Sequence, residues 1–129
     1  MILVDTSVWV DHLRASDAVL VGLLDAGMVL THPFVIGELA LGNLGQRETV
    51  LSALSDLPRA IVATDAEVLH FIDRYTLFRR GVGYVDTHLL AAVQLTAGAK
   101  LWTCDKRLHG TALPLDLAIT LPLHRVSQG

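Results

Sequence analysis

The N-terminal stretch Met1-Ile2-Leu3-Val4-Asp5-Thr6-Ser7 decides the fold class of this chain. Four apolar residues come first, and a strand without a polar face is typical of a parallel sheet that helices cover on both sides. Asp5 follows at once, and the two hydroxyl residues behind it can begin a helix. Ligands of open α/β sheets bind at the carboxyl ends of the strands. The stretch therefore predicts a parallel sheet with Asp5 in a ligand site at its edge.

The remaining sequence alternates apolar runs with helical patterns, which indicates a parallel α/β fold. Helices are expected at residues 6–14, 17–26, 33–42, 48–57, 65–80 and 85–98, and strands at 1–4, 28–31, 60–63, 100–103 and around 117–119. Ser16 is the expected N-cap of the second helix, and Thr64 and Glu67 have the spacing of a capping box. The chain has 129 residues, with no internal repeat, and we expect a single domain over residues 1–129.

Composition limits the class of protein. No apolar run approaches the ~18 residues of a membrane-spanning helix, and the N-terminus lacks the basic flank of a signal sequence. A single cysteine excludes an intrachain disulfide and a zinc site made of several cysteines. We therefore expect a cytoplasmic protein that binds no membrane. The high hydrophobic content, 52%, and the Leu-rich segments 19–24 and 34–57 predict that another chain covers part of the surface.

Four acids are placed so that they can converge. Asp5 and Asp105 each follow an apolar strand, whereas Glu38 and Asp86 lie on helices that can lean over the same edge. Taken singly, each acid has a structural explanation, such as a solvent boundary or the first turn of a helix. Two carboxylates about 5 Å apart would repel by roughly 3 kcal/mol at an effective dielectric constant near 20. A divalent cation removes this repulsion, and oxygen-only ligands favour Mg²⁺ or Mn²⁺.

The net charge of −3 neither supports nor excludes a nucleic-acid partner. A binder of nucleic acid is expected to carry a basic surface. The chain has 13 acidic and 10 basic residues, but leaving out the four acids of the expected metal site makes the balance nearly neutral.

Several segments together resemble the motifs of PIN-domain ribonucleases. They are Ile2-Leu3-Val4-Asp5-Thr6-Ser7-Val8-Trp9, Glu38-Leu39, Asp86 before Leu89-Leu90-Ala91-Ala92, and Thr103-Cys104-Asp105. The short chain is similar to the VapC type of toxin in bacterial toxin–antitoxin pairs. The resemblance implies a PIN-like three-layer α/β fold, with a central parallel sheet flanked by helices. It implies Asp5 and Asp86 as the main metal ligands, Glu38 as a direct or water-mediated ligand and Asp105 as the fourth acid, while Thr6 and Thr103 match hydroxyl positions that orient the acids or their waters.

The same resemblance implies a Mg²⁺- or Mn²⁺-dependent endoribonuclease that hydrolyses RNA phosphodiester bonds. Its expected partners are RNA, a small VapB-like antitoxin whose C-terminal segment lies near the acids, and a second copy of the chain, in homodimers and toxin–antitoxin hetero-oligomers. Glu38 or Asp105 would accept the proton of the attacking water. Basic residues that flank the acids in sequence are candidates for contacts with RNA phosphates: Arg79, Arg80, Lys106 and Arg107.

Two other classes of protein stay open at this point. Phosphoaspartyl proteins also place Asp at a strand end, but haloacid-dehalogenase enzymes need D-x-D where this chain has Ser7, and receivers need an acidic pair where it has Val4. A non-catalytic PIN-fold module would bind RNA or protein without cleaving RNA. The six histidines show no metal-binding spacing, and most are expected at the surface or at helix edges.

Overall fold

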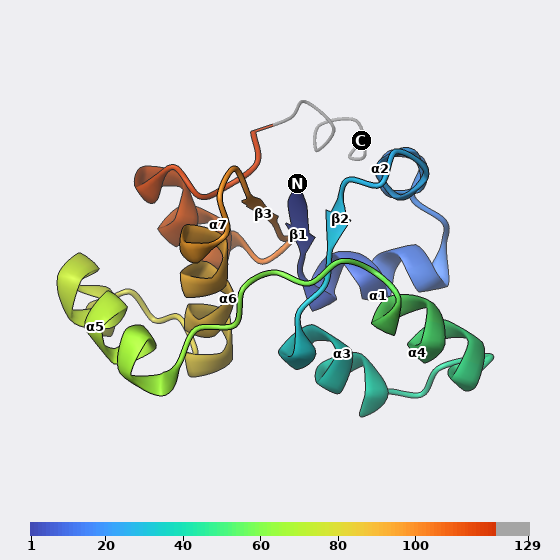
Figure 1. Ribbon diagram of the computed structural model, residues 1–129, viewed down its shortest axis with the longest axis horizontal. Helices are drawn as coiled ribbons and strands as arrows, with labels where there is room; N and C mark the ends of the chain where they lie inside the picture. The colour runs from blue at the N-terminus through green and yellow to red at the C-terminus, as the bar shows by residue number, and fades with distance from the viewer. Residues whose placement is uncertain (121–129) are drawn as a thin grey trace.

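The computed structural model describes residues 1–120, in which a small parallel sheet lies between two groups of helices (Figure 1). The strands are β1 (Ile2–Val4), β2 (Val29–Leu30) and β3 (Lys100–Trp102), and their order in the sheet is β2-β1-β3. Both pairings are parallel, with Ile2 opposite Val29 on one side and opposite Lys100 on the other. The carboxyl ends of all three strands therefore lie at one edge, and the residues that follow β1 and β3 meet there.

Helices cover both sides of this sheet. They are α1 (Thr6–Arg14), α2 (Ala18–Asp25), α3 (Pro33–Ala40), α4 (Arg47–Ser55), α5 (Asp65–Tyr75), α6 (Tyr84–Leu95) and α7 (Lys106–Ala112), with 3₁₀ turns η1 (Leu77–Arg79) and η2 (Leu113–Leu115). In Figure 1, α1 to α4 gather on one side of the strands and α5 to α7 on the other. The predicted three-layer α/β fold with a central parallel sheet is confirmed. Within residues 1–120, no helix is long and apolar enough to span a membrane.

The core forms around β1, the strand from which the fold was predicted. Leu3 and Val4 have no exposed surface, as expected for a central strand without a polar face. On α6, every residue from 87 to 93 is buried, so this helix is the main cover of the sheet on its side. Trp9 of α1 is also buried, as its apolar side chain predicts. Burial of such large apolar side chains contributes about 1.5–3 kcal/mol each.

The strand predicted at residues 60–63 is wrong. The chain pairs with the end of β2 through one isolated parallel bridge, between Thr31 and Arg59, and then leaves the sheet. The N–H of Ile61 donates instead to the Thr96 hydroxyl, at the end of α6 (2.9 Å). Ile61 and Val62 are exposed. An apolar run can therefore be recognised from sequence, but a strand also needs a neighbour that accepts its backbone hydrogen bonds.

The last predicted strand, around residues 117–119, is reduced to one parallel bridge between Leu101 and Ala118. Hydrogen bonds of 2.7 Å and 2.9 Å join the Leu101 N–H to the carbonyl of Leu117 and the N–H of Ile119 to the carbonyl of Leu101. The part of the prediction beyond residue 120 lies outside the described residues.

Helix ends differ from the prediction where a side chain or a backbone angle decides them. Asp17, not Ser16, caps α2, because its carboxylate accepts the N–H groups of Val19 and Leu20 (2.9 and 3.0 Å). The capping box of Thr64 and Glu67 is confirmed at the start of α5. That helix ends at Tyr75 rather than near residue 80, since Thr76 takes a left-handed conformation (φ 55°) that breaks the hydrogen-bond ladder. Helix α7 was not predicted.

Candidate active site

Four elements bring the four predicted acids to the carboxyl edge of the sheet. Asp5 ends β1 and stands at the N-cap position of α1, and Asp105 stands at the N-cap position of α7, just after β3. Glu38 lies in α3, and Asp86 lies in the first turn of α6. Asp5 is buried, Asp86 is half-buried, and the other two acids are exposed. The edge is therefore an acidic site that is closed on the Asp5 side and open on the Glu38 and Asp105 side.

Two hydroxyl groups hold the buried Asp5 carboxylate. Its Oδ2 accepts hydrogen bonds from Thr103 Oγ1 (2.7 Å) and from Ser7 Oγ (2.8 Å). Hydrogen bonds to a charged acceptor are stronger than neutral ones, and they satisfy a group that would be costly to bury without partners. Because both donors bind one oxygen, the orientation of the carboxylate is set while Oδ1 stays available.

Ser7 is a site residue that the sequence reasoning missed, since it was seen only as a residue that can begin a helix. Its Oγ accepts the Cys104 N–H (3.0 Å), donates to Asp5 and lies 3.3 Å from Thr103 Oγ1. Ser7 therefore joins the end of β1 to the residues that follow β3. The local signal that could have suggested it is a hydroxyl residue two positions after an Asp at a strand end.

Hydrogen bonds hold the two exposed acids. Thr6 Oγ1 donates to Glu38 Oε1 (2.6 Å), so the first residue of α1 tethers a carboxylate of α3. Asp105 Oδ1 accepts the N–H groups of Arg107 and Leu108 (2.9 and 3.0 Å) and thereby caps α7. Thr6 and Thr103 are the two hydroxyl residues predicted to support the site. Thr6 contacts Glu38, whereas Thr103 donates to Asp5 and also accepts the backbone N–H of Asp105 (3.0 Å).

The acids act on one another electrostatically. The pKa of Asp86 is raised from 3.8 to about 6, first by burial and then by the negative charges of Asp5, Asp105 and Glu38. No ion pair within residues 1–120 joins a basic side chain to any of the four acids. As the side chains stand, no group of three or more His, Cys, Asp or Glu residues in this described part could hold a metal ion. The site is therefore a set of mutually repelling carboxylates, none of which is in an ion pair with a basic side chain in the part of the chain that the structure describes.

The four basic candidates for RNA contact lie on two segments beside this site. Lys106 and Arg107 line a cleft of about 410 Å³ together with Asp86 and Asp105. Arg107 contacts the Gly81 carbonyl (3.5 Å). The other two candidates are Arg79, the last residue of η1, and Arg80, which follows it. The guanidinium of Arg79 lies over the ring of Phe78, and Arg80 donates to the Gly110 carbonyl of α7 (3.2 Å). Lys106 and Arg107 are therefore the pair that the fold places in the acidic cleft.

Two of the histidines, His32 and His88, are buried next to this site, whereas His12, His70 and His109 are exposed or partly exposed, as expected for most of them. His32 is fully buried and His88, two residues after Asp86, is nearly so. The Phe34 ring lies between them, with centroid distances of 5.2 and 4.7 Å. Burial, followed by the charges of His88 and Arg59, lowers the pKa of His32 to about 4. His32 is therefore neutral at pH 7, and its Nδ1 accepts the Phe34 N–H (3.0 Å) as the N-cap of α3.

Comparison with known proteins agrees with this fold. The chain belongs to the PIN-domain family, whose model matches residues 2–113. It is similar to Ribonuclease VapC32 of Mycobacterium tuberculosis, both in strain CDC 1551 / Oshkosh and in strain ATCC 25618 / H37Rv. In each case the identity is 50% over 119 residues, which cover 92% of this chain and 96% of the relative. The resemblance to the VapC type of PIN-domain protein is therefore confirmed.

Proposed function

We propose that this chain is a divalent-metal-dependent endoribonuclease and the toxin of a toxin–antitoxin pair. The observation that carries the proposal is the convergence of Asp5, Glu38 and Asp105 on Asp86, a carboxyl whose pKa burial, and then these three negative charges, raise to about 6. Perturbed acids of this kind cluster at functional sites. The name of the similar mycobacterial proteins, Ribonuclease VapC32, supports the same activity.

The donor set fits a hard divalent cation. Carboxylates offer only oxygen, which Mg²⁺ and Mn²⁺ prefer. Asp5 and Asp86 would hold the ion, with Glu38 and Asp105 as direct or water-mediated ligands. Mg²⁺ usually keeps several of its waters and needs only one or two direct carboxylate ligands, which such a site can supply. A bound ion would supply positive charge to the phosphate and would acidify a water molecule.

The side chains of the site would hold and move protons around the scissile phosphate. Asp5 keeps its orientation through Thr103 and Ser7, which limits reorganisation during the reaction. Glu38 is the better candidate for accepting the proton of the attacking water, since only one of its oxygens is held, by Thr6. Asp105 is the second candidate, although its Oδ1 already accepts two backbone N–H groups.

Cationic side chains in the cleft would place the RNA. Lys106 and Arg107 line the same cleft as Asp86 and Asp105. Phosphates next to the scissile bond would therefore contact a basic side chain while the scissile phosphate lies at the acids. Arg79, at the end of η1, and Arg80, directly after it, would contact further phosphates of the RNA. Such phosphate contacts position RNA and carry no sequence information by themselves.

An apolar surface beside the acids supports an antitoxin as a further partner. A hollow of about 460 Å³ extends from Val10 and Leu13 of α1 to Glu38. A second hollow, of about 260 Å³, shares Leu13 and is lined by Trp9 and Leu54. An amphipathic segment of the antitoxin could bury apolar side chains there, and a terminal Arg or Lys could then pair with the acids.

The decisive experiment is incubation of RNA with the purified chain in Mg²⁺, in Mn²⁺ and in EDTA, with mapping of the fragment ends. Cleavage should require the metal and should fall at least about a hundredfold in Asp86→Asn, on the scale typical for loss of an essential charged group. Asp65→Asn makes the same chemical change at an exposed acid outside the site and should keep full activity.

Two results would contradict the proposal. Cleavage in EDTA as fast as in Mg²⁺ or Mn²⁺ would exclude metal dependence. Cleavage by Asp86→Asn as fast as by the parent protein would show that the acidic site does not catalyse the reaction. RNA binding without cleavage under all conditions would instead favour the non-catalytic PIN-fold module.

A further inference from the structure

Gly81, between η1 and α6, lies in close contact with the side chain of Arg107 on α7. Its φ angle of 72° belongs to the left-handed region, which residues with a Cβ rarely adopt. A Cβ atom at this position would lie 2.9 Å from Nη1 and 3.1 Å from Cδ of Arg107. Glycine is therefore needed here for two separate reasons, the backbone angle and the space that the arginine occupies.

The backbone of Gly81 also holds the arginine in place. Its carbonyl accepts a hydrogen bond from Nη1 of Arg107 (3.5 Å). A guanidinium has several N–H groups, so the others stay available for a ligand. Both residues line the cleft that contains Asp86 and Asp105. Gly81 thus fixes the position of a cation beside the acids.

A second contact anchors the segment around Gly81 to α7. Arg80 donates through Nη2 to the carbonyl of Gly110 (3.2 Å). Arg107 lies near the start of α7 and Gly110 near its end, so the two segments are joined at two points and in both directions. This anchoring opposes a shift of the backbone at residue 81. A Cβ introduced there would therefore displace the side chain of Arg107.

We propose that Gly81 is a positioning residue, which holds Arg107 ready to contact the RNA phosphate next to the scissile one; this inference rests on the function proposed above. Phosphate contacts fix the register of a nucleic acid on a protein. An arginine that is already held loses less conformational freedom when it binds a phosphate. Gly81 acts through Arg107 and makes no contact of its own with the RNA.

The salt dependence of RNA binding tests this role by a readout other than cleavage. All proteins in this assay carry Asp86→Asn, so that the RNA stays intact, and the anisotropy of a labelled single-stranded RNA of mixed sequence is measured over a range of KCl concentrations. Arg107→Ala should lower the slope of log affinity against log salt by about 0.7, the value for one phosphate contact of a single strand. Gly81→Ala should lower the slope in the same direction and should weaken binding about three- to tenfold.

Gly98→Ala is the matched control. Gly98 also has a left-handed φ angle (74°), but a Cβ there would meet no atom within 4 Å, and the residue precedes β3, away from the carboxyl edge of the sheet. Both substitutions force a Cβ into the same backbone region, so both should lower the melting temperature to a similar degree. Only Gly81→Ala should change RNA binding.

The double variant Gly81→Ala/Arg107→Ala separates positioning from a general structural effect. Once Arg107 is shortened to alanine, a Cβ at residue 81 has no side chain to displace, so the double variant should bind RNA as Arg107→Ala does. In the chain with Asp86 intact, Gly81→Ala should raise KM for RNA and leave kcat nearly unchanged, because a contact outside the reacting centre contributes equally to the ground state and the transition state.

The possible failures are distinguishable. Additive losses in the double variant, or a salt slope of Gly81→Ala equal to that of Gly98→Ala, would overturn the positioning role and leave the proposed nuclease intact. Absence of RNA binding by the Asp86→Asn protein together with absence of cleavage by the unmodified chain would overturn the proposed function, and the role of Gly81 with it.

Discussion

At the end of β1, one carboxylate oxygen of Asp5 accepts hydrogen bonds from two hydroxyls, those of Ser7 and Thr103. The two donors are 96 residues apart in the chain, and their oxygens are 3.3 Å apart. At the scale of single residues, the acidic site therefore depends on a small hydroxyl network as much as on the acids themselves. Such a network limits the movement of Asp5 and leaves its second oxygen for a ligand.

Ser7→Ala should weaken metal binding and RNA cleavage while keeping the fold. Asp5 loses one of two hydroxyl donors, and the Cys104 N–H loses its acceptor. A hydrogen bond to a charged group is worth about 1.5–3 kcal/mol, so a decrease of ten- to a hundredfold in activity is expected. Cleavage rates and isothermal titration with Mn²⁺ measure the two effects. Ser16→Ala, at an exposed serine that caps no helix, is the matched control; equal activity of both variants would rule out the proposed role of Ser7.

Asp86 should make the stability of the metal-free protein depend on pH. Its pKa in the folded state, about 6, is above the ordinary value of 3.8, so the folded state binds the proton more tightly than the unfolded state. The associated stability is fully present below pH 4 and is lost as the pH rises through 6. Urea unfolding in EDTA should show this loss in the parent protein and not in Asp86→Asn, which should be the more stable of the two at pH 7. A parallel pH profile in both proteins would contradict the coupling of the acids.

At the scale of elements, α3 and α6 are joined by a buried stack of rings next to the site. His32 caps α3, and its ring packs on Phe34, which in turn packs on His88 of α6. Tyr84, at the start of α6, adds an edge contact to His88 (4.7 Å). Glu38 lies after Phe34 on α3, and Asp86 lies between Tyr84 and His88 on α6. The stack therefore sets the spacing between these two acids.

His32 should make stability depend on pH in the direction opposite to that of Asp86. Its folded pKa, about 4, lies below the ordinary 6.5, so the folded state disfavours the protonated ring. Stability is therefore lost as the pH falls from 6.5 to 4. In an Asp86→Asn background, where the opposite contribution of that acid is absent, His32→Asn should remove this acid-dependent loss. Asparagine still caps a helix well, so α3 can form even though the smaller side chain lowers stability at every pH. An unchanged slope of stability between pH 6.5 and 4 would contradict this origin.

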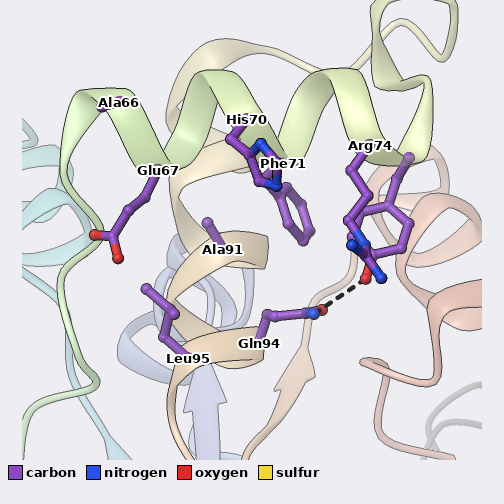
Figure 2. Close-up of a pocket in the computed structure, with 9 residues that line it drawn as sticks. Ala66, Glu67, His70, Phe71, Arg74, Ala91, Gln94 and Leu95 are labelled. Atoms are coloured by element: carbon purple, nitrogen blue, oxygen red, sulfur yellow. Dashed lines mark hydrogen bonds between the residues drawn. The ribbon is translucent and has the colours of Figure 1, made fainter.

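At the scale of the whole molecule, helices on the two sides of the sheet present different surfaces. The α1 side has two apolar hollows, one of which reaches Glu38, and the α5–α6 side has a groove with Glu67 and Arg74 in its walls (Figure 2). The acidic edge of the sheet lies between elements from both sides (Figure 1). The proposed RNA site and the proposed antitoxin surface therefore lie on different parts of one small domain.

Divalent metal should stabilise the folded protein as a whole. A ligand that binds only the folded state adds about 2.7 kcal/mol when its concentration is a hundred times its dissociation constant. Mg²⁺ or Mn²⁺ at millimolar concentration should raise the melting temperature, and EDTA should reverse the rise. Asp5→Asn should abolish the shift, whereas Asp65→Asn should show it in full. Equal shifts in the parent protein and in Asp5→Asn would place the bound metal elsewhere.

Expression of the chain alone should be toxic or give poorly soluble protein, and a short reading frame just upstream should encode its inhibitor. Co-expression should yield a stable complex and should suppress RNA cleavage. Leu13→Asp, which puts a charge where the two apolar hollows meet, should prevent the complex without reducing cleavage by the free chain. Leu113→Asp makes the same change at an exposed position of η2 and is the control. Failure of the upstream product to bind or to inhibit would refute the antitoxin part of the proposal.

The sequence by itself determined the fold class, the family and the order of the acids along the chain. An apolar strand followed by an acid is a local pattern, and in a parallel sheet that pattern alone places Asp5 and Asp105 at the same edge. The capping box at Thr64 is equally local, and for that reason it was predicted correctly. The catalytic and metal-binding roles of the acids stay predictions that the variants above test.

Only the tertiary structure decided which groups meet across the chain. Ser7 contacts Thr103 and Cys104 because β1 and β3 are neighbours in the sheet, and no local spacing encodes that pairing. His32 and His88 are buried because the stack around Phe34 encloses them, although histidine is more often exposed. Residues 60–63 have the composition of a strand but lack a partner that would complete a ladder. Side-chain type and local order can be read from a sequence, whereas hydrogen-bond partners and burial depend on which segments the fold brings together.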